Sequence, residues 1–161
     1  MNSMRITYSY KKNRYYLRMK KPTILLIEDD ELDVISVERS LKKLESDYVL
    51  HTAYNGIEAL KILRDTNKRL IPDVILLDIN MPRMNGIEFL KVIREDKNLK
   101  DLKVFIMTTS SEGNDRQEAE NLGISGYIIK PLNYTENTKR SDSMDAFVQF
   151  HLRKILNDEN N

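Results

Sequence analysis

Residues 74–90 read VILLDINMPRMNGIEFL, and this stretch decides the fold. Its first four residues are a continuous apolar run, which is typical of a strand buried on both faces of a sheet. Asp78 ends the run, and Pro82 and Gly86 are turn residues that follow it. Residues 86–95 then carry apolar side chains at helical spacing. The stretch predicts a strand-loop-helix unit with a carboxylate at the carboxyl end of the strand.

The rest of the chain after residue 22 repeats this unit. Short apolar runs alternate with amphipathic stretches, which predicts βα units and a parallel sheet. The further strands are predicted at residues 23–27, 48–53, 104–107 and 126–129, and the further helices at residues 30–45, 57–63, 114–122 and 143–156. The fold class is therefore α/β: a doubly wound parallel sheet of five strands with helices on both faces.

Polar residues follow four of these apolar runs where each predicted strand ends. Glu28 and Asp29 follow the first, and Asp78, Thr108 and Lys130 follow the others. Any one of them alone would be read as an ordinary solvated loop residue. In an open parallel sheet, however, ligands bind beyond the carboxyl ends of the strands. Their conjunction predicts a magnesium-dependent site for a phosphoryl group on an aspartate.

Four segments carry a family resemblance: ILLIEDDELDV, VILLDINMPRMNGIEFL, VFIMTTS and GYIIKP, which begin at residues 24, 74, 104 and 126. Together they resemble the response-regulator receiver domain, which has a flavodoxin-like (βα)5 fold. Asp78, Thr108 and Lys130 match that family in spacing, at separations of 30 and 22 positions. The resemblance covers residues 22–156. Because the remaining residues show no pattern of a second domain, we expect a stand-alone receiver. Within the family, the first two segments are similar to the small regulators that serve cyanobacterial phytochrome kinases.

The resemblance implies a role for each acid of the predicted site. Asp78 is expected to accept the phosphoryl group and form an acyl phosphate. Asp29 is expected to bind Mg²⁺ directly, Glu28 to hold a metal-bound water, and Asn80 to offer its backbone carbonyl to the metal. The chain would then be a two-component response regulator. It would receive phosphate from a sensor histidine kinase and catalyse only its own phosphorylation and dephosphorylation.

The remaining expected roles concern what neighbouring side chains do when Asp78 is phosphorylated. Lys130 is expected to pair with Asp78 at rest and to contact a phosphoryl oxygen afterwards. The Thr108 hydroxyl is expected to turn toward the phosphoryl group, and Tyr127 to turn inward into the space that it leaves. Because His51 and His151 have no neighbouring metal-ligand partners in the sequence, we interpret both as structural.

Three other functions compete with this interpretation. A phosphohydrolase of the haloacid dehalogenase type also uses an aspartate at a strand end, but it needs an acid two positions later, where this chain has Asn80. A pseudo-receiver that only binds partners would be expected to lose Asp29, Asp78 or Lys130. A nucleotide-binding protein would be expected to carry a glycine-rich loop after the first strand, where this chain is acidic.

Composition limits the remaining classes. The chain has 161 residues, a net charge of +1 and no cysteine, so disulfides and thiolate metal sites are excluded. Residues 1–21 contain seven basic and no acidic side chains, and we expect them to form a flexible extension. Residues 22–156 form the predicted receiver, and residues 157–161 a frayed polar tail. The acidic domain and the lack of a long apolar run predict a cytoplasmic protein that binds neither nucleic acid nor membrane.

The expected partners follow from the predicted function. A sensor histidine kinase would supply the phosphoryl group, with a phytochrome-like kinase as the narrower expectation. Residues 114–122, 126–129 and 143–156 are expected to form the output face, and Phe150 to support a homodimer there. Residues 133–142 are a longer connection than the usual strand-to-helix loop and would border that face.

Overall fold

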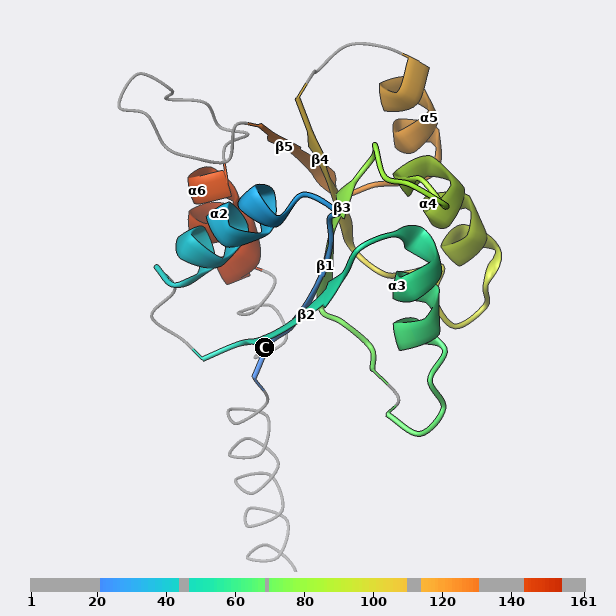
Figure 1. Cartoon of the computed structure of the whole chain (residues 1–161), viewed down its shortest axis with the longest axis horizontal. Coiled ribbons are helices and arrows are strands. Elements are labelled where there is room, and N and C mark those ends of the chain that lie inside the picture. The colour runs from blue at the N-terminus through green and yellow to red at the C-terminus, as the bar shows by residue number, and fades with distance from the viewer. Residues whose placement is uncertain (1–20, 44–46, 69, 110–113, 131–143, 155–161) are drawn as a thin grey trace, which may run out of the picture.

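The computed structural model describes residues 21–43, 47–68, 70–109, 114–130 and 144–154. Its centre is a parallel sheet with the strand order β2-β1-β3-β4-β5 (Figure 1). The strands are β1 (Thr23–Ile27), β2 (Val49–Ala53), β3 (Val74–Asp78), β4 (Val104–Thr108) and β5 (Gly126–Ile129). The predicted five-stranded doubly wound sheet is confirmed.

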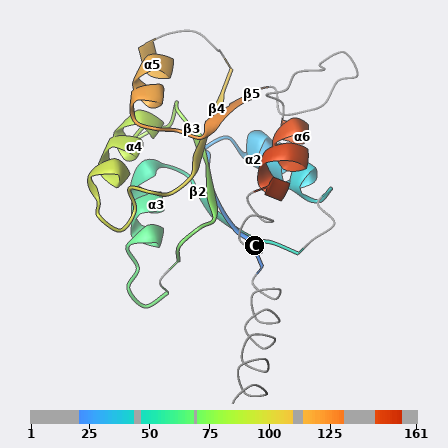
Figure 2. The ribbon, with the colours of Figure 1, turned by 180° about the vertical axis from the view of Figure 1, so that it is seen from behind.

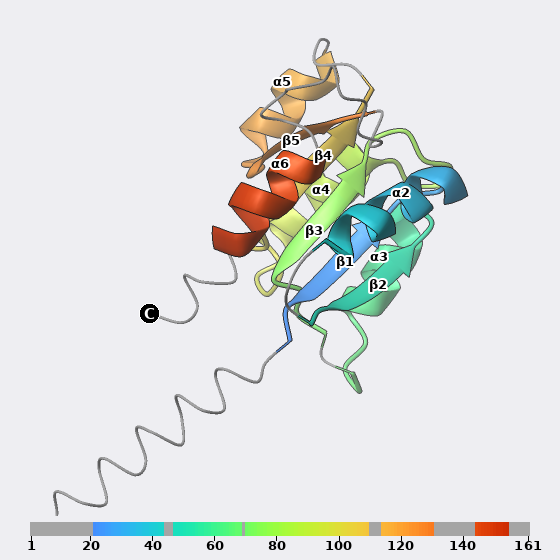
Figure 3. The same ribbon diagram turned by 90° about the vertical axis from the view of Figure 1, so that its left-hand side faces the viewer.

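Helices cover both faces of this sheet. They are α2 (Glu31–Leu41), α3 (Gly56–Leu63), α4 (Gly86–Glu95), α5 (Asn114–Asn121) and α6 (Met144–Ala146), which continues into the π-helix η1 (Phe147–Leu152). Helices α3, α4 and α5 lie on one face, and α2 and α6 lie on the other (Figures 2 and 3). No helix in the described part of the chain is long and apolar enough to cross a bilayer.

The apolar strand runs explain why two cores form. Side chains alternate between the two faces of a strand, so a strand with helices on both sides must be apolar throughout. In β1, Leu25 and Ile27 pack into the core under α3, α4 and α5, whereas Ile24 and Leu26 pack into the core under α2 and α6. All residues of β3 are buried. The strands that end at the predicted site are therefore held on both faces.

Some predicted boundaries differ from the structure. Strands β3 and β4 each include one more residue than expected, so Asp78 and Thr108 are the last residues of their strands. The predicted helix at residues 30–45 ends as α2 at Leu41. The predicted helix at residues 143–156 is helical throughout its described part, residues 144–154, but its backbone changes from α6 to the π-helical η1, which buries Phe147 on the sheet. Residues 1–20, 133–142 and 155–161 lie outside the described residues.

Arg94 fixes the connections on the side of the sheet that α4 covers. Its guanidinium donates hydrogen bonds to the carbonyl oxygens of Leu122, Gly123, Lys100 and Leu102, at 2.7, 3.1, 2.7 and 3.1 Å. Burial lowers the pKa of this arginine. The carbonyls belong to the turn before β5 and to the segment before β4. One side chain of α4 therefore links the approaches to two strands.

Gly86 gives a test of how closely the loop after Asp78 is packed. A Cβ atom at Gly86 would overlap the Asp78 carbonyl oxygen and would lie 2.9 Å from the Ile79 Cα. Alanine normally stabilises a helix relative to glycine. Here we expect Gly86→Ala to lower the free energy of unfolding by about 2–3 kcal/mol, because rigid backbone would have to move. Urea unfolding of the two proteins measures the difference.

Gly123 provides the matched control for this substitution. Its φ is +69°, but a Cβ atom added there would have no neighbouring atom within 4 Å. Gly123→Ala should therefore lower stability only by the backbone term, about 1 kcal/mol. Equal losses at the two positions would contradict the proposed clash at Gly86.

Candidate functional site

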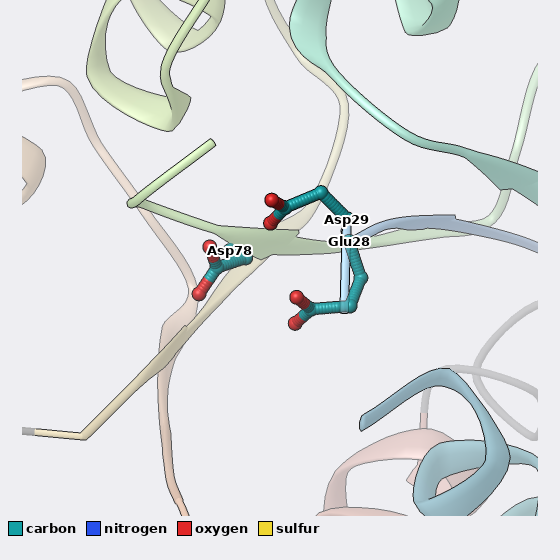
Figure 4. A group of neighbouring side chains, drawn as sticks. All are labelled: Glu28, Asp29 and Asp78. Atoms are coloured by element: carbon teal, nitrogen blue, oxygen red, sulfur yellow. The ribbon is translucent and has the colours of Figure 1, made fainter. Parts of the chain in front are cut away.

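Three carboxylates meet at the carboxyl ends of β1 and β3. Glu28 and Asp29 directly follow β1, and Asp78 is the last residue of β3. The two strands are neighbours in the sheet, with Ile27 paired to Leu77. The side chains turn toward a common space, and their nearest oxygens all lie within 4.8 Å of one another (Figure 4). The sheet order thus brings together the acids that the sequence separates.

Lys130 joins this group from the end of β5. Its ammonium lies 2.9 Å from Glu28 Oε2, 3.0 Å from Asp78 Oδ1 and 2.7 Å from Asp33 Oδ2. The Lys130 backbone N–H donates to the Thr108 carbonyl at 2.7 Å, which continues the β4–β5 pairing. The predicted pairing of Lys130 with Asp78 is therefore present, within a larger ionic cluster.

Burial determines the electrostatics of this cluster. Glu28 is 1% and Asp78 5% exposed, and burial raises the pKa of both carboxyls although each accepts a hydrogen bond from Lys130. The negative charge of Asp29 raises the pKa of Asp78 further. The pKa of Lys130 is also raised, because its three carboxylate contacts outweigh its own burial. Among the residues that the structure describes, the Lys130 ammonium is shared by three carboxylates, which is too many for one charge to neutralise.

This donor set fits a divalent metal ion that prefers oxygen ligands. Glu28, Asp29 and Asp78 each offer one carboxylate oxygen at mutually compatible distances. Two of these acids are buried and Asp29 is exposed, so the group opens to solvent on the Asp29 side. Mg²⁺ usually binds through one or two carboxylates and retains several waters. The acids therefore have the right chemistry and the right excess of negative charge.

The other predicted site residues lie around this cluster. Thr108 ends β4, the strand next to β3, one residue beyond the Asp78–Met107 pair. Asn80 is exposed, and its backbone forms a hydrogen bond with Asp78 that lowers the pKa of that carboxyl. His51 lies in β2, away from the cluster, and His151 lies in η1.

Tyr127 lies on β5, against helix α5. Its hydroxyl donates a hydrogen bond of 2.9 Å to the Arg116 carbonyl. The Arg116 guanidinium carbon lies 4.5 Å from the centroid of the Tyr127 ring, in a cation–π contact, and its Nε lies 3.1 Å from Glu120 Oε1. The side chain predicted to be a switch is thus held against α5 by two contacts with one residue.

Asp33 is the site residue that the sequence analysis missed. It lies in the first turn of α2, where an acid is ordinarily explained by the helix dipole. Its contact with Lys130 is the shortest of the three. The available signal was its position in a helix that begins at the carboxyl edge of the sheet, three residues after the N-cap Asp30.

Comparison with known proteins agrees with this geometry. The family model of the response regulator receiver domain matches residues 24–141. The chain is 34% identical over 126 residues to the sensor histidine kinase CheAY of Helicobacter pylori. The aligned region covers 76% of this chain but only 15% of that kinase. It is 30% identical over 127 residues to the response regulator Rcp1 of Synechocystis. This aligned region covers 77% of this chain and 86% of Rcp1.

Solved structures have the same fold. The Mn²⁺-bound form of Rcp1 matches with a TM-score of 0.71 at 29% identity, covering 81% of this chain and 94% of Rcp1. A two-component response regulator from Legionella pneumophila matches with a TM-score of 0.69 at 41% identity, covering 86% of this chain and 99% of that regulator. The phosphorylated cyanobacterial phytochrome response regulator RcpA matches with a TM-score of 0.65 at 26% identity, covering 88% of this chain and 90% of RcpA.

These matches differ in what they cover. The chain spans about one seventh of the length of the Helicobacter kinase, which extends well beyond the matched region. It spans most of Rcp1 and nearly all of the Legionella regulator. None of these findings favours the haloacid dehalogenase or nucleotide-binding alternatives. Fold, acidic cluster and family model agree, and the chain belongs to the response regulator receiver family, the phosphoacceptors of two-component signalling.

Proposed function

We propose that Asp78 is the phosphoacceptor and that a sensor histidine kinase supplies the phosphoryl group. One observation carries the proposal: Asp78 is a buried carboxylate at the end of β3, flanked by two further acids and by the Lys130 ammonium. An ionised aspartate that lacks enough neutralising charge is well placed to react with an electrophilic phosphorus. The other two acids remain available to hold a cation.

The proposed reaction is an in-line phosphoryl transfer. An Asp78 carboxylate oxygen forms a bond to the phosphorus while the bond between phosphorus and the kinase histidine nitrogen breaks, and that nitrogen keeps the electron pair. The product is an acyl phosphate on Asp78. Lys130 then exchanges its Asp78 contact for a phosphoryl oxygen. Transfers of this kind depend mainly on positioning and charge neutralisation, which these residues provide.

We assign the metal site to Glu28, Asp29 and Asp78, together with the Asn80 backbone carbonyl. When bound, Mg²⁺ would neutralise charge that develops on the phosphoryl oxygens. The existence of an Mn²⁺-bound form of Rcp1 supports a divalent cation in this chain, and three converging carboxylates support its place here. The preference for magnesium follows from its small size and its need for oxygen ligands.

The proposed partners follow from this role. The similarity to Rcp1 and to the phytochrome regulator RcpA supports a phytochrome-like kinase. The signal would leave through the face formed by α5, β5 and α6, where Tyr127 contacts Arg116. We propose a homodimer through this face. The lack of cysteine is compatible with the reducing cytoplasm, where we place the protein.

The first prediction concerns the acceptor. Asp78→Asn should abolish label incorporation from a small phosphodonor or a kinase, because an amide oxygen cannot form a stable acyl phosphate. Removing divalent cation with EDTA should have the same effect on the wild type. Asp101→Asn, which removes an exposed carboxylate elsewhere, is the control and should incorporate normally. Incorporation by Asp78→Asn at the wild-type level would refute the assignment.

The second prediction concerns stability without metal. Because burial raises the pKa of Glu28 and Asp78, their ionisation opposes folding. A carboxyl with a raised folded-state pKa stabilises below its ordinary value and loses this contribution as the pH rises. In EDTA, Asp78→Asn should therefore melt near the wild-type temperature close to the ordinary pKa of 3.8. At neutral pH it should melt about 3 °C higher.

Thermal melts of both proteins over this pH range, with and without Mg²⁺, measure the effect. Added Mg²⁺ should raise the wild-type melting temperature more than that of Asp78→Asn. If the variant melted below the wild type at neutral pH in EDTA, the Lys130 contact would outweigh burial and the electrostatic interpretation would be wrong.

The third prediction concerns the switch. Thr108→Ala should accept phosphate but leave Tyr127 in contact with Arg116, because the proposed pull of the hydroxyl toward the phosphoryl group is lost. Tyrosine ring NMR signals, recorded with Mg²⁺ and a beryllium fluoride phosphoryl mimic, report this contact. Only the wild type should show a shifted Tyr127 signal. Equal shifts in both proteins would contradict the coupling.

Sedimentation velocity on the same samples tests the homodimer. The wild type should associate when the mimic is bound, and Thr108→Ala should remain largely monomeric. A wild-type monomer under every condition would remove the dimer while leaving the kinase as a partner of the same face.

A further inference from the structure

The Lys130 ammonium has three N–H groups, and each has a carboxylate within hydrogen-bonding distance. The three acceptors come from three different segments: Glu28 after β1, Asp78 at the end of β3, and Asp33 in α2. The side chains of Glu28 and Asp78 are 1% and 6% exposed, and that of Asp33 is 26% exposed. Asp33 therefore closes the cluster on the side nearer to solvent.

Asp33 differs from the other two acceptors in one respect. Glu28 and Asp78 belong to the carboxylate group that can hold a metal ion, and Asp33 does not. Under the proposed function, Glu28 and Asp78 would gain new partners when cation and phosphoryl group bind. The contact between Asp33 and Lys130 is the one that can persist throughout.

The backbone of Asp33 is held in place by the N-cap and the packing of α2. The side chain of the N-cap residue Asp30 accepts hydrogen bonds from the backbone N–H groups of Leu32 and Asp33, at 2.8 and 3.4 Å. Farther along α2, Val37 and Leu41 are fully buried against the sheet. Lysine has a long and flexible side chain, so a fixed acceptor near its end restricts where the charge can lie.

We propose that Asp33 is a positioning residue that anchors the Lys130 ammonium while its partner changes from the Asp78 carboxylate to a phosphoryl oxygen. This inference rests on the proposed function for its catalytic consequence, but the anchor itself is a property of the resting protein. Without Asp33, one N–H of Lys130 turns to water and the side chain gains freedom. Phosphoryl transfer then slows although every residue that contacts the phosphoryl group is present.

The first experiment observes the anchor directly in the metal-free full chain. Correlation spectra of the ¹⁵Nζ–¹H groups of lysine detect ammonium hydrogens that exchange slowly with water, and the signal missing from Lys130→Arg identifies Lys130. Its exchange should be slow in the wild type and about three- to tenfold faster in Asp33→Ala, as expected for the loss of one hydrogen bond that is partly exposed to solvent. Asp33→Asn, which keeps an acceptor oxygen, should be intermediate.

Glu31→Gln is the matched control. Glu31 also lies in the first turn of α2, so this variant loses a similar interaction with the helix dipole. Its carboxylate is not one of the three that Lys130 contacts. Exchange at Lys130 should be unchanged in Glu31→Gln. Rapid exchange in the wild type, or unchanged exchange in Asp33→Ala, would overturn the proposal.

The second experiment measures the catalytic consequence with acetyl phosphate as donor. At saturating Mg²⁺, Asp33→Ala should be phosphorylated about three- to tenfold more slowly than wild type, with the half-saturating Mg²⁺ concentration changed less than about twofold. In a Lys130→Met background, Asp33→Ala should have no further effect, because the residue acts through Lys130. An equal effect in both backgrounds, or a change in Mg²⁺ affinity alone, would overturn the positioning role.

The two experiments separate the two hypotheses. If the wild type took no phosphate on Asp78, the proposed function would fail, and the ammonium exchange would still decide whether Asp33 anchors Lys130. If phosphorylation proceeded normally and Asp33→Ala changed neither measurement, the function would stand and the anchor would not.

Discussion

The structure depends on one ammonium group placed among buried carboxylates. Like charges repel more strongly in a buried site than in water, so the cluster persists only if a cation lies within it. Lys130 is that cation in the resting protein, and a bound metal ion would be the second. The need for both explains why β1, β3 and β5 must end at one edge of the sheet. The parallel direction of all five strands satisfies this need.

The site has a tightly packed centre around Asp78 and a more weakly held periphery around Tyr127. Asp78 ends a strand that is buried on both faces, and Gly86 lets the following loop lie directly against it. Tyr127, by contrast, is held on α5 by one hydrogen bond and one cation–π contact. Interactions of this kind contribute about 1 kcal/mol each. Under the proposed function, a charge change at Asp78 would alter these two weak contacts without disturbing the sheet.

The sequence predicted the centre better than the periphery. Apolar runs followed by Glu28, Asp78 and Lys130 predicted the strands and the meeting of these three side chains, because a buried parallel strand and its polar end leave a clear pattern. Asp33 left none, since an acid in a first helical turn has a sufficient local explanation. Its role depends on where the Lys130 side chain reaches, which is a property of the assembled fold.

The same limit applies to helix details. Helical periodicity at residues 143–156 predicted an apolar face, and Phe147 and Leu152 are indeed buried. It did not distinguish α-helical from π-helical backbone, because the two patterns differ little over six residues. The contact between Arg116 and Tyr127 was equally hidden, since α5 is polar and its packing depends on individual side chains.

The distance along the chain between the members of the ionic cluster has a consequence for biosynthesis. Glu28 and Lys130 are 102 positions apart, so their contact forms only after β5 has joined the sheet. Long-range contacts of this kind form late, because a large loop must close first. In a nascent chain whose Lys130 is still inside the ribosome, the carboxylates of Glu28 and Asp78 would lack the ammonium that pairs with them. Under the proposed function, the resting arrangement of the acceptor site is complete only once β5 has joined the sheet.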